Sequence, residues 1–181
     1  MKAILLTALL SFVLSTGSPA QTCRKVVRDN SGRVVQTIDR QKQAGGTECA
    51  VIRDASGRVI GTATTRVSAG GGQTTFRDAS GRSAGSATTQ GSSSGSSRTT
   101  YRDASGRTTG SATTSGSAGS GNRTQFRDAS GRLTGTESSH GTGNTTTTRR
   151  DASGRYTGKS TRSGGCASAM RVPVPPPGAK R

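Results

Sequence analysis

The sequence contains few residues that could fill a hydrophobic core. Aromatic residues make up 3% of it, tryptophan is absent, and hydrophobic residues reach only 27%. Burying a large apolar side chain contributes roughly 1.5–3 kcal/mol, whereas ordering one residue costs about 1–2 kcal/mol of backbone entropy. The composition therefore argues against a conventional packed core. Either repeated backbone pairing orders the chain, or much of it is disordered in isolation.

Residues with catalytic or metal-binding chemistry are also scarce. The only histidine, His140, lies in a Ser/Gly/Thr linker without a paired acid, and the three cysteines are Cys23, Cys49 and Cys166. Their spacing fits no zinc site. No phosphate-binding Gly-Lys-Ser/Thr loop is present, and the Gly-Gly-x-Gly-x-Asp pattern of calcium-binding repeats is absent. We therefore expect no catalytic residue, no cofactor and no metal, and we expect that the protein is not an enzyme.

Acidic residues are outnumbered by basic ones. The chain has 26 Lys and Arg against 9 Asp and Glu, which gives a formal net charge of +17. Such a chain is attracted to polyanions: nucleic acid, anionic glycans, lipopolysaccharide or anionic lipid surfaces. Charge alone does not choose among these partners, and it could equally serve to keep a repetitive surface soluble.

One six-residue motif, Arg-Asp-(Ala/Asn)-Ser-Gly-Arg, dominates the rest of the sequence. It occurs six times, and its successive aspartates are separated by 25, 24, 25, 25 and 23 residues. A period of this size indicates a small supersecondary unit repeated along the chain. Gly, Ser and Thr linkers separate the copies, and the frequency of these residues disfavours helix.

The motif predicts the turn of a β-hairpin. Its Asp can bond back to the backbone and its Gly can take a positive φ, as in a type I turn followed by a G1 bulge. The predicted turn-forming residues are Asp29, Gly32, Asp54, Gly57, Asp78, Gly81, Asp103, Gly106, Asp128, Gly131, Asp151 and Gly154. In this register we expect each Asp to face the second Arg of its motif as an exposed pair.

The residue before each motif predicts a buried stripe. It is apolar in five copies and Arg149 in the sixth; the apolar ones are Val27, Ile52, Phe76, Tyr101 and Phe126. A single hairpin is marginally stable in water, so the hairpins are expected to pair with one another. The fold class expected is all-β: six hairpins of about 25 residues, stacked as a solenoid or single-layer sheet, or polymerised as cross-β. The fifth and sixth copies depart from the pattern, which we interpret as capping of a stack.

The repeat resembles a known β-hairpin family. Tyr101-Arg102-Asp103-Ala104-Ser105-Gly106-Arg107 is similar to the YD (Rhs-type) repeat, whose Tyr-Asp-x-x-Gly-Arg core forms a hairpin in a large shell or fibre. This chain departs from that pattern by an Arg between the aromatic residue and the Asp, and it lacks the enclosed toxin domain. The layout of strand-loop-strand repeats also resembles the curlin-type fibre subunits, without their Gln/Asn positions.

The two ends of the chain differ from the repeat region at 21–163. Residues 1–20 are typical of a secretory signal peptide, with Lys2, an apolar run over Ala3–Leu14, and a small-x-small site ending at Ala20. We expect cleavage after Ala20, a secreted or periplasmic product, and no transmembrane segment after cleavage. Residues 164–181 form a basic, proline-rich tail, for which we expect a disordered or polyproline II segment.

The cysteines suggest one disulfide. Cys23 and Cys49 occupy nearly the same place in the first two repeats, and stacked repeats would bring equivalent positions about 4.7–4.9 Å apart. This separation suits a disulfide, and an exported protein meets an oxidising environment. We therefore predict a Cys23–Cys49 bond, with Cys166 left unpaired or available for an intermolecular bond.

The functional hypothesis follows from the arginines, because the turn accounts for the other residues of the motif. We expect an exported, non-enzymatic structural or adhesive component that binds a glycan, lipopolysaccharide or nucleic acid. The predicted polyanion-binding residues are Arg28, Arg33, Arg53, Arg58, Arg77, Arg82, Arg102, Arg107, Arg127, Arg132, Arg150 and Arg155. Self-association into an amyloid-like fibre, and a disordered cationic chain that orders on a partner, are the alternatives.

Overall fold

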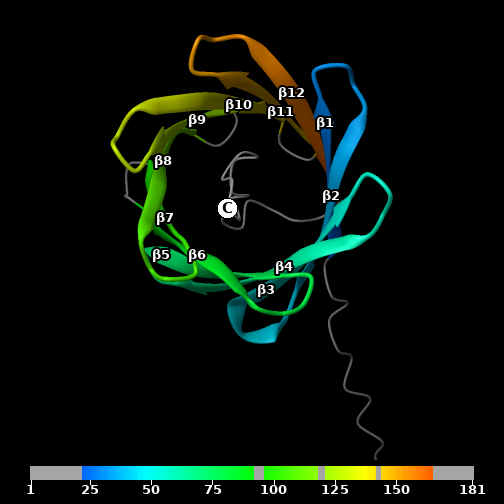
Figure 1. Ribbon diagram of the computed structural model, residues 1–181, viewed down its shortest axis with the longest axis vertical. Helices are drawn as coiled ribbons and strands as arrows, with labels where there is room; N and C mark the ends of the chain where they lie inside the picture. Colours follow the sequence, from blue (N-terminus) through cyan, green and yellow to red (C-terminus); the bar gives the residue numbers. More distant parts are fainter. Residues whose placement is uncertain (1–21, 92–95, 118–120, 142–143, 165–181) are drawn as a thin grey trace, which may run out of the picture.

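The protein is a closed, antiparallel β-barrel of twelve strands in the residues that the computed structural model describes, which are 22–91, 96–117, 121–141 and 144–164 (Figure 1). The strands are β1 (Thr22–Asp29), β2 (Val34–Lys42), β3 (Thr47–Asp54), β4 (Val59–Ser68), β5 (Gly71–Asp78), β6 (Ser83–Gly91), β7 (Ser97–Arg102), β8 (Thr108–Ser117), β9 (Gly121–Asp128), β10 (Leu133–His140), β11 (Thr145–Asp151) and β12 (Tyr156–Ser163). A short 3-10 turn, η1 (Ala44–Gly46), joins β2 to β3. Over these residues, no helix is long and apolar enough to cross a membrane.

The all-β prediction is confirmed, but the predicted open arrangement is wrong. Each strand pairs with its neighbours in sequence, and β12 returns to pair with β1. The result is neither a solenoid with one repeat per rung nor a flat sheet. A barrel satisfies the backbone groups of both edge strands, which an open sheet leaves unpaired.

The turn motif forms as its chemistry predicts. In the copy at 102–107, the Gly106 N–H donates to the Asp103 carbonyl (3.0 Å) and the Asp103 N–H donates to the Arg107 carbonyl (2.9 Å). Gly106 has a φ of 85°, the left-handed conformation that glycine adopts without strain. The strand register shifts between Tyr101 and Arg102, as a β-bulge requires. The same backbone hydrogen bonds recur in all six motifs.

The hairpins join one another in a single repeated register. At each of the six junctions, the residue four places after the second Arg of a motif pairs with the first Arg of the next motif. The pairs are Thr37–Arg53, Thr62–Arg77, Ser86–Arg102, Ser111–Arg127, Thr136–Arg150 and, at the closing junction, Lys159–Arg28. Because the closing junction has the same register as the other five, the hairpins repeat around the barrel by rotation.

Glycines at these junctions allow the close approach of neighbouring hairpins. Gly61 lies three residues after Arg58, and a Cβ there would be 2.6 Å from the Arg77 carbonyl oxygen. Glycine occupies the same repeat position in every hairpin but the first, which has Gln36. Our sequence analysis gave this glycine no role.

Small side chains line much of the barrel interior. Ala50, Ala63, Ala87 and Ala112 are buried, and they pack with Ile38, Phe76 and Tyr101. The predicted buried stripe is thus confirmed at Phe76 and Tyr101, whereas Ile52 and Phe126 are only partly buried. Interior threonines bond across neighbouring hairpins: the Oγ1 atoms lie 2.8 Å apart for Thr65–Thr74 and Thr89–Thr99, and 2.9 Å apart for Thr114–Thr124.

The atypical fifth and sixth repeats do not cap a stack, because the closed barrel has no terminal repeat. Their unusual residues face the interior instead. Arg149, at the stripe position of the sixth copy, pairs with Glu137 of the fifth, and its Nε lies 2.9 Å from Glu137 Oε1. Ser139 and Ser160 are buried among them.

The predicted Cys23–Cys49 disulfide is wrong. Cys23 is in a disulfide bond, but Cys49 is a free, half-buried thiol. The reason is the hairpin itself: β2 lies between β1 and β3, so equivalent positions of successive repeats are two strand spacings apart, about 10 Å. That separation exceeds the reach of a disulfide, about 7 Å between Cα atoms. Cys166 lies outside the described residues, as do the predicted signal peptide and the tail from residue 165 onward.

Candidate functional site

The six turn motifs lie at one end of the barrel, which we call the turn rim. Each motif connects the two strands of one hairpin, β1–β2, β3–β4, β5–β6, β7–β8, β9–β10 or β11–β12, and these hairpins are consecutive around the barrel. The view down the barrel shows the hairpins following one another around the barrel axis (Figure 1). Closure of the barrel therefore brings all twelve predicted arginines to the turn rim, although up to 127 positions separate them in the sequence.

The first arginine of each motif is tied to its own turn. The Arg102 Nη1 donates to the Gly106 carbonyl at 2.8 Å, and the equivalent bond in the other five motifs is 2.7–3.1 Å long. These hydrogen bonds help to hold the turn, so the first arginines have a structural role in addition to their charge.

The second arginine of each motif presents its side chain to solvent. Arg33, Arg58, Arg82, Arg107, Arg132 and Arg155 are all exposed. The turn uses only their backbone: the Arg107 N–H donates to Asp103 Oδ1 at 2.9 Å. The predicted exposed charge pair of Asp with the second Arg is not among the ion pairs of the described residues; the two residues meet through the arginine's backbone amide instead. The guanidinium groups of the second arginines are the best-placed groups on the rim for binding a ligand.

The turn aspartates are committed to holding the turn. Asp103 Oδ1 also accepts hydrogen bonds from the Ser105 hydroxyl (2.6 Å) and the Ser105 N–H (3.0 Å). The serine hydroxyl is the main reason why the pKa of the Asp103 carboxyl lies below its ordinary value, and the Arg107 N–H adds to the effect. The pKa is lowered for the same main reason at Asp54, Asp78, Asp128 and Asp151. In the first motif, the Ser31 hydroxyl points instead to Asn30 Oδ1, at 3.5 Å.

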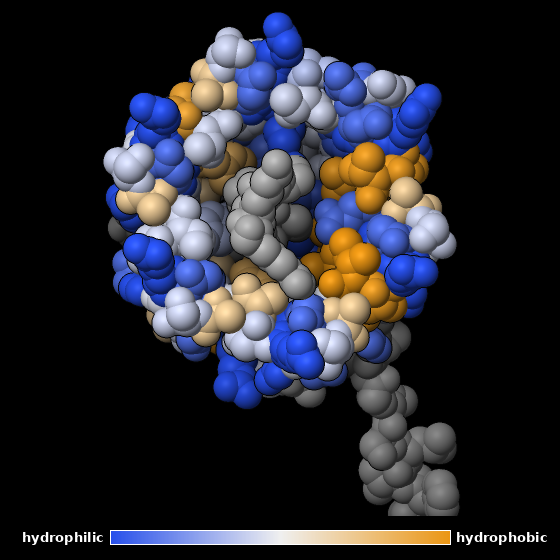
Figure 2. Space-filling view, in the orientation of Figure 1, coloured by the Kyte–Doolittle hydropathy of each residue, from blue (hydrophilic) through white to orange (hydrophobic). Residues whose placement is uncertain are grey.

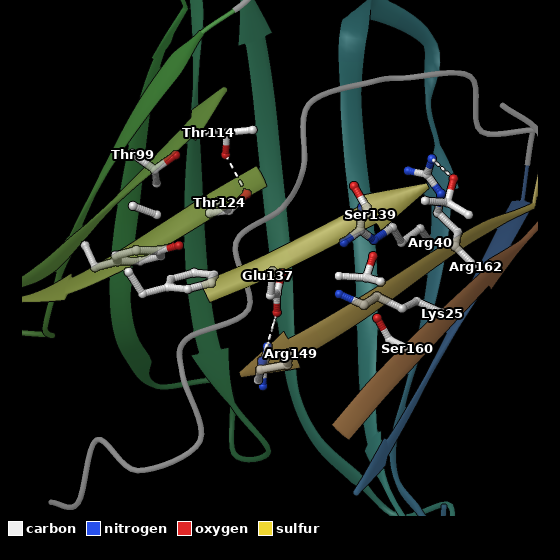
Figure 3. A pocket seen from close by; sticks show the side chains of 15 residues that line it. Lys25, Arg40, Thr99, Thr114, Thr124, Glu137, Ser139, Arg149, Ser160 and Arg162 are labelled. Atoms are coloured by element: carbon white, nitrogen blue, oxygen red, sulfur yellow. Dashed lines mark hydrogen bonds and ion pairs between the residues drawn. The ribbon is translucent and has the colours of Figure 1, made fainter. Parts of the chain in front are cut away.

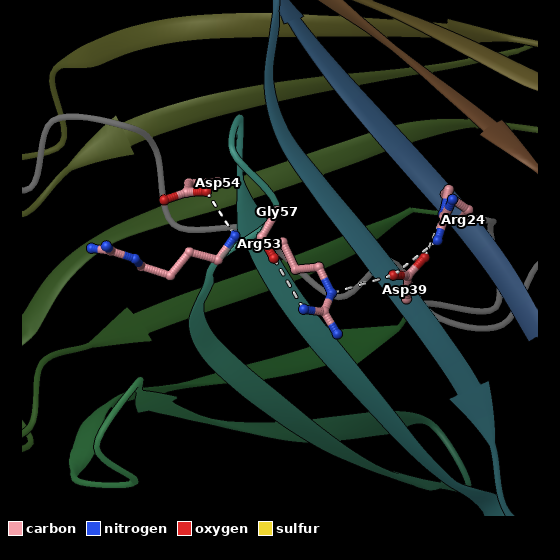
Figure 4. Close-up of polar contacts among 6 residues, drawn as sticks. Arg24, Asp39, Arg53, Asp54 and Gly57 are labelled. Atoms are coloured by element: carbon pink, nitrogen blue, oxygen red, sulfur yellow. Dashed lines mark hydrogen bonds and ion pairs between the residues drawn. The ribbon is translucent and has the colours of Figure 1, made fainter.

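An exposed ion-pair network joins three strands on the outer wall (Figure 4). Asp39 on β2 lies between Arg24 on β1, at 2.6 Å, and Arg53 on β3, at 3.8 Å. Exposed pairs of this kind contribute about 0–1 kcal/mol. Arg53 thus has both a carboxylate neighbour and its turn carbonyl, Gly57 O at 3.1 Å, which makes it a poorer ligand-binding candidate than Arg58.

The barrel interior contains a second cluster of charges that our sequence analysis missed (Figure 3). A cavity of about 100 Å³ has an apolar side at Tyr101, Ala112 and Phe126, on β7, β8 and β9, and a charged side on the strands that continue around the barrel from β10 to β2. The charged groups lining it are Lys25, Arg40, Glu137, Arg149 and Arg162. The sequence feature that could have revealed this cluster is the departure of the last two repeats from the repeat pattern. Our sequence analysis interpreted that departure as capping of a stack.

Burial affects the groups of this interior cluster. Arg40 is buried, and its Nη1 lies 3.5 Å from Glu48 Oε1. Burial lowers the pKa of the Arg40 guanidinium, Glu48 opposes that shift, and the positive charge of Arg162 adds to it. Burial likewise raises the pKa of the Tyr101 hydroxyl. Arg162 donates to Thr145 Oγ1 at 3.1 Å, so part of this cluster is satisfied by interior hydroxyls.

Apolar residues lie beside one part of the turn rim. Val35 and Ile60 are 44% and 43% exposed, and each follows the second arginine of its motif by two residues. Figure 2 shows the largest strongly hydrophobic groups on one side of the barrel, and mostly hydrophilic residues with smaller hydrophobic groups around the rest. The equivalent residues of the other hairpins are Ala84, Thr109, Thr134 and Thr157, so this apolar feature belongs mainly to the first two hairpins.

The end of the barrel opposite the turn rim has a different set of arginines. Arg66, Arg98 and Arg123 are exposed and lie near the ends of β4, β7 and β9 that are far from the turns. His140, at the end of β10, is exposed as well. Among the described residues, no three His, Cys, Asp or Glu side chains are grouped closely enough to hold a metal ion.

Comparison with known proteins assigns no family and no function to this barrel. No family model, curated protein or solved structure matches the chain. The position and exposure of the arginines are therefore the basis for a functional proposal.

Proposed function

We propose that the protein is an exported, non-enzymatic β-barrel that binds polyanions through the second arginines of its turn rim. The polyanion is an anionic glycan, lipopolysaccharide or nucleic acid, and the role is that of a structural or adhesive component outside the cytoplasm. One observation carries the proposal: six exposed arginines, one from each hairpin, lie at the same end of the barrel.

The charges on the rim favour an anionic partner. Its six motifs contain twelve arginines and six aspartates, which leaves a formal charge of +6. Each aspartate faces into its turn and accepts backbone hydrogen bonds, whereas the second arginines face solvent. A guanidinium presents a planar set of donors that suits carboxylate, sulfate and phosphate groups. A field of one sign over one end of a molecule also steers a charged partner toward that end.

A pair of charge-matched variants tests the proposal. The rim variant replaces Arg82, Arg107 and Arg132 with Gln, and the control variant replaces Arg66, Arg98 and Arg123 with Gln. Both lower the formal net charge by three, from +17 to +14. Binding to heparin and to a DNA duplex is measured over a range of salt concentrations, after circular dichroism has shown that both variants keep the strand spectrum.

We expect the rim variant to bind more weakly than the control variant. On the DNA duplex, its slope of log affinity against log salt should fall by about one for each phosphate contact that the substituted arginines make. Equal losses in the two variants would show that net charge, and not the rim, governs binding. Absence of binding to both polyanions by the unaltered protein would overturn the proposal.

A further inference from the structure

The state of two cysteines identifies the role of the third. Cys23 is in a disulfide bond, whereas Cys49 is a free thiol. The sequence has three cysteines in all, and the third is Cys166. By elimination, Cys166 is the one partner that the chain itself can offer to Cys23.

The sheet gives a second reason why Cys49 is not that partner. Cys23 pairs with Arg40 on β2, Arg40 pairs with Ala50 on β3, and all three are buried on the interior face. Cys49 lies between two buried residues, Glu48 and Ala50. Successive residues of a strand point to opposite faces, so Cys49 faces the outer wall. The two cysteines therefore lie on opposite faces of the sheet as well as two strands apart.

The chain at the end of β12 lies directly against Cys23. Ser163 pairs with Arg24, and a Cβ on the next residue, Gly164, would be 3.1 Å from the Cys23 Cα. Cys166 is two positions beyond Gly164, and two residues of chain span at most about 7 Å. Bonded cysteines have Cα atoms about 4.4–6.8 Å apart. A cysteine at position 166 is therefore within reach of Cys23.

Burial of Cys23 favours a partner from the same chain. Cys23 is 5% exposed, and its side chain is on the interior face of the barrel beside Gly164. Formation of a disulfide requires access to the sulfur. The segment that follows Gly164 begins next to this sulfur, whereas another folded barrel meets only the outside of the wall.

We propose that Cys23 and Cys166 form a disulfide bond that covalently locks the junction of β1 with β12. These two strands lie side by side and close the barrel (Figure 1), and 143 positions separate the two cysteines in the sequence. Formation of the bond oxidises two thiols to one disulfide. The two electrons and two protons pass to a disulfide oxidant such as oxidised glutathione, which becomes two thiols. The lock goes beyond polyanion binding and uses only the expected export to an oxidising compartment.

Peptide mapping of the unaltered full-length protein tests the pairing. The protein is equilibrated with oxidised glutathione, its free thiols are alkylated, and it is digested with trypsin. Cleavage after Lys and Arg places the cysteines on separate peptides: one that ends at Arg24, one over 43–53 and one over 163–171. We expect the 43–53 peptide to be alkylated and the other two to be joined by a bond that a reductant releases.

Two matched variants, Cys166→Ser and Cys49→Ser, test the lock. Unfolding in urea is measured with and without a reductant. In the unaltered protein and in Cys49→Ser, the reductant should raise the equilibrium constant for unfolding by roughly 30-fold to 1,000-fold, the range typical of a disulfide. Cys166→Ser should have the higher constant without reductant and should not respond to it.

Several results would overturn the inference. A cross-link that contains the 43–53 peptide, alkylation of all three cysteines, or a disulfide-linked dimer in electrophoresis without reductant would each show a different state of Cys23. An equal response of Cys166→Ser and Cys49→Ser to the reductant would show that Cys166 does not hold the junction. Since no polyanion is present in these measurements, their outcome is independent of binding at the turn rim.

Discussion

The turn aspartates show how single residues hold each hairpin. One oxygen of Asp103 accepts three hydrogen bonds, from the Ser105 hydroxyl, the Ser105 N–H and the Arg107 N–H. An ionised carboxylate accepts such bonds more strongly than a neutral acid does. The charged form is therefore favoured in the folded chain, which is why the carboxyl pKa lies below the ordinary value of 3.8.

This carboxylate predicts acid sensitivity. Because the folded pKa is lower than the unfolded one, the stabilisation is complete above the unfolded value and is lost as the pH falls through the folded pKa. We expect the urea midpoint to fall when the pH is lowered below 3.8. Asp103→Asn, whose amide oxygen can still accept the three bonds, should show a smaller fall, because it removes one titrating group.

The variant Asp103→Ala separates the hydrogen bonds from the charge. It removes the acceptor altogether, so it should be less stable than Asp103→Asn at neutral pH. Equal acid-induced falls in the unaltered protein and in Asp103→Asn would contradict the role of this carboxylate.

At the scale of the hairpin, local chemistry could be predicted from the sequence and long-range pairing could not. Asp, Ser and Gly within six residues specify the turn, and the structure has that turn in every motif. The disulfide depended on which strands are neighbours, and there β2 separates Cys23 from Cys49. The close approach at Gly61 involves a carbonyl of the next hairpin, so no pattern within one repeat explains that glycine.

This close approach predicts an unusual response to a small substitution. In an ordinary strand, Gly→Ala is stabilising by about 0.5–1 kcal/mol. Gly61→Ala should instead be destabilising by about 1–3 kcal/mol, because the new Cβ would crowd the Arg77 carbonyl and push the hairpins apart. The measurement is the free energy of unfolding in urea.

The control is Gln36→Ala, which changes the same repeat position in the only hairpin that already has a side chain there. It should alter the free energy of unfolding by no more than about 0.5–1 kcal/mol. A stabilising Gly61→Ala would show that the junction has room for a side chain.

At the scale of the whole molecule, closure of the barrel was the feature that the sequence did not reveal. A constant repeat register is equally compatible with an open sheet, a solenoid and a ring. What distinguishes the ring is the pairing of β12 with β1, which joins the two ends of the repeat region and which no pattern within one repeat reveals. Closure also removes the strand edges on which the fibre hypothesis depended.

A closed barrel predicts a monomer. Sedimentation velocity should give one monomeric species at every concentration measured, and thioflavin should not bind. Thr161→Pro on β12, which removes a strand N–H between β1 and β11, should open one junction and promote aggregation. Fibres formed by the unaltered protein would contradict this prediction and favour the curlin-like alternative.

The pairing of β12 with β1 also sets the order in which the chain can fold. Arg28 and Lys159 are partners although 131 positions separate them in the sequence, whereas the two arms of each hairpin are local. Hairpins of this kind form within about 1–10 μs, but a contact between distant segments requires slow loop closure. Until that last contact forms, the nascent sheet has two free edges that another chain can join. Refolding yield should therefore depend on protein concentration even though the finished barrel is a monomer.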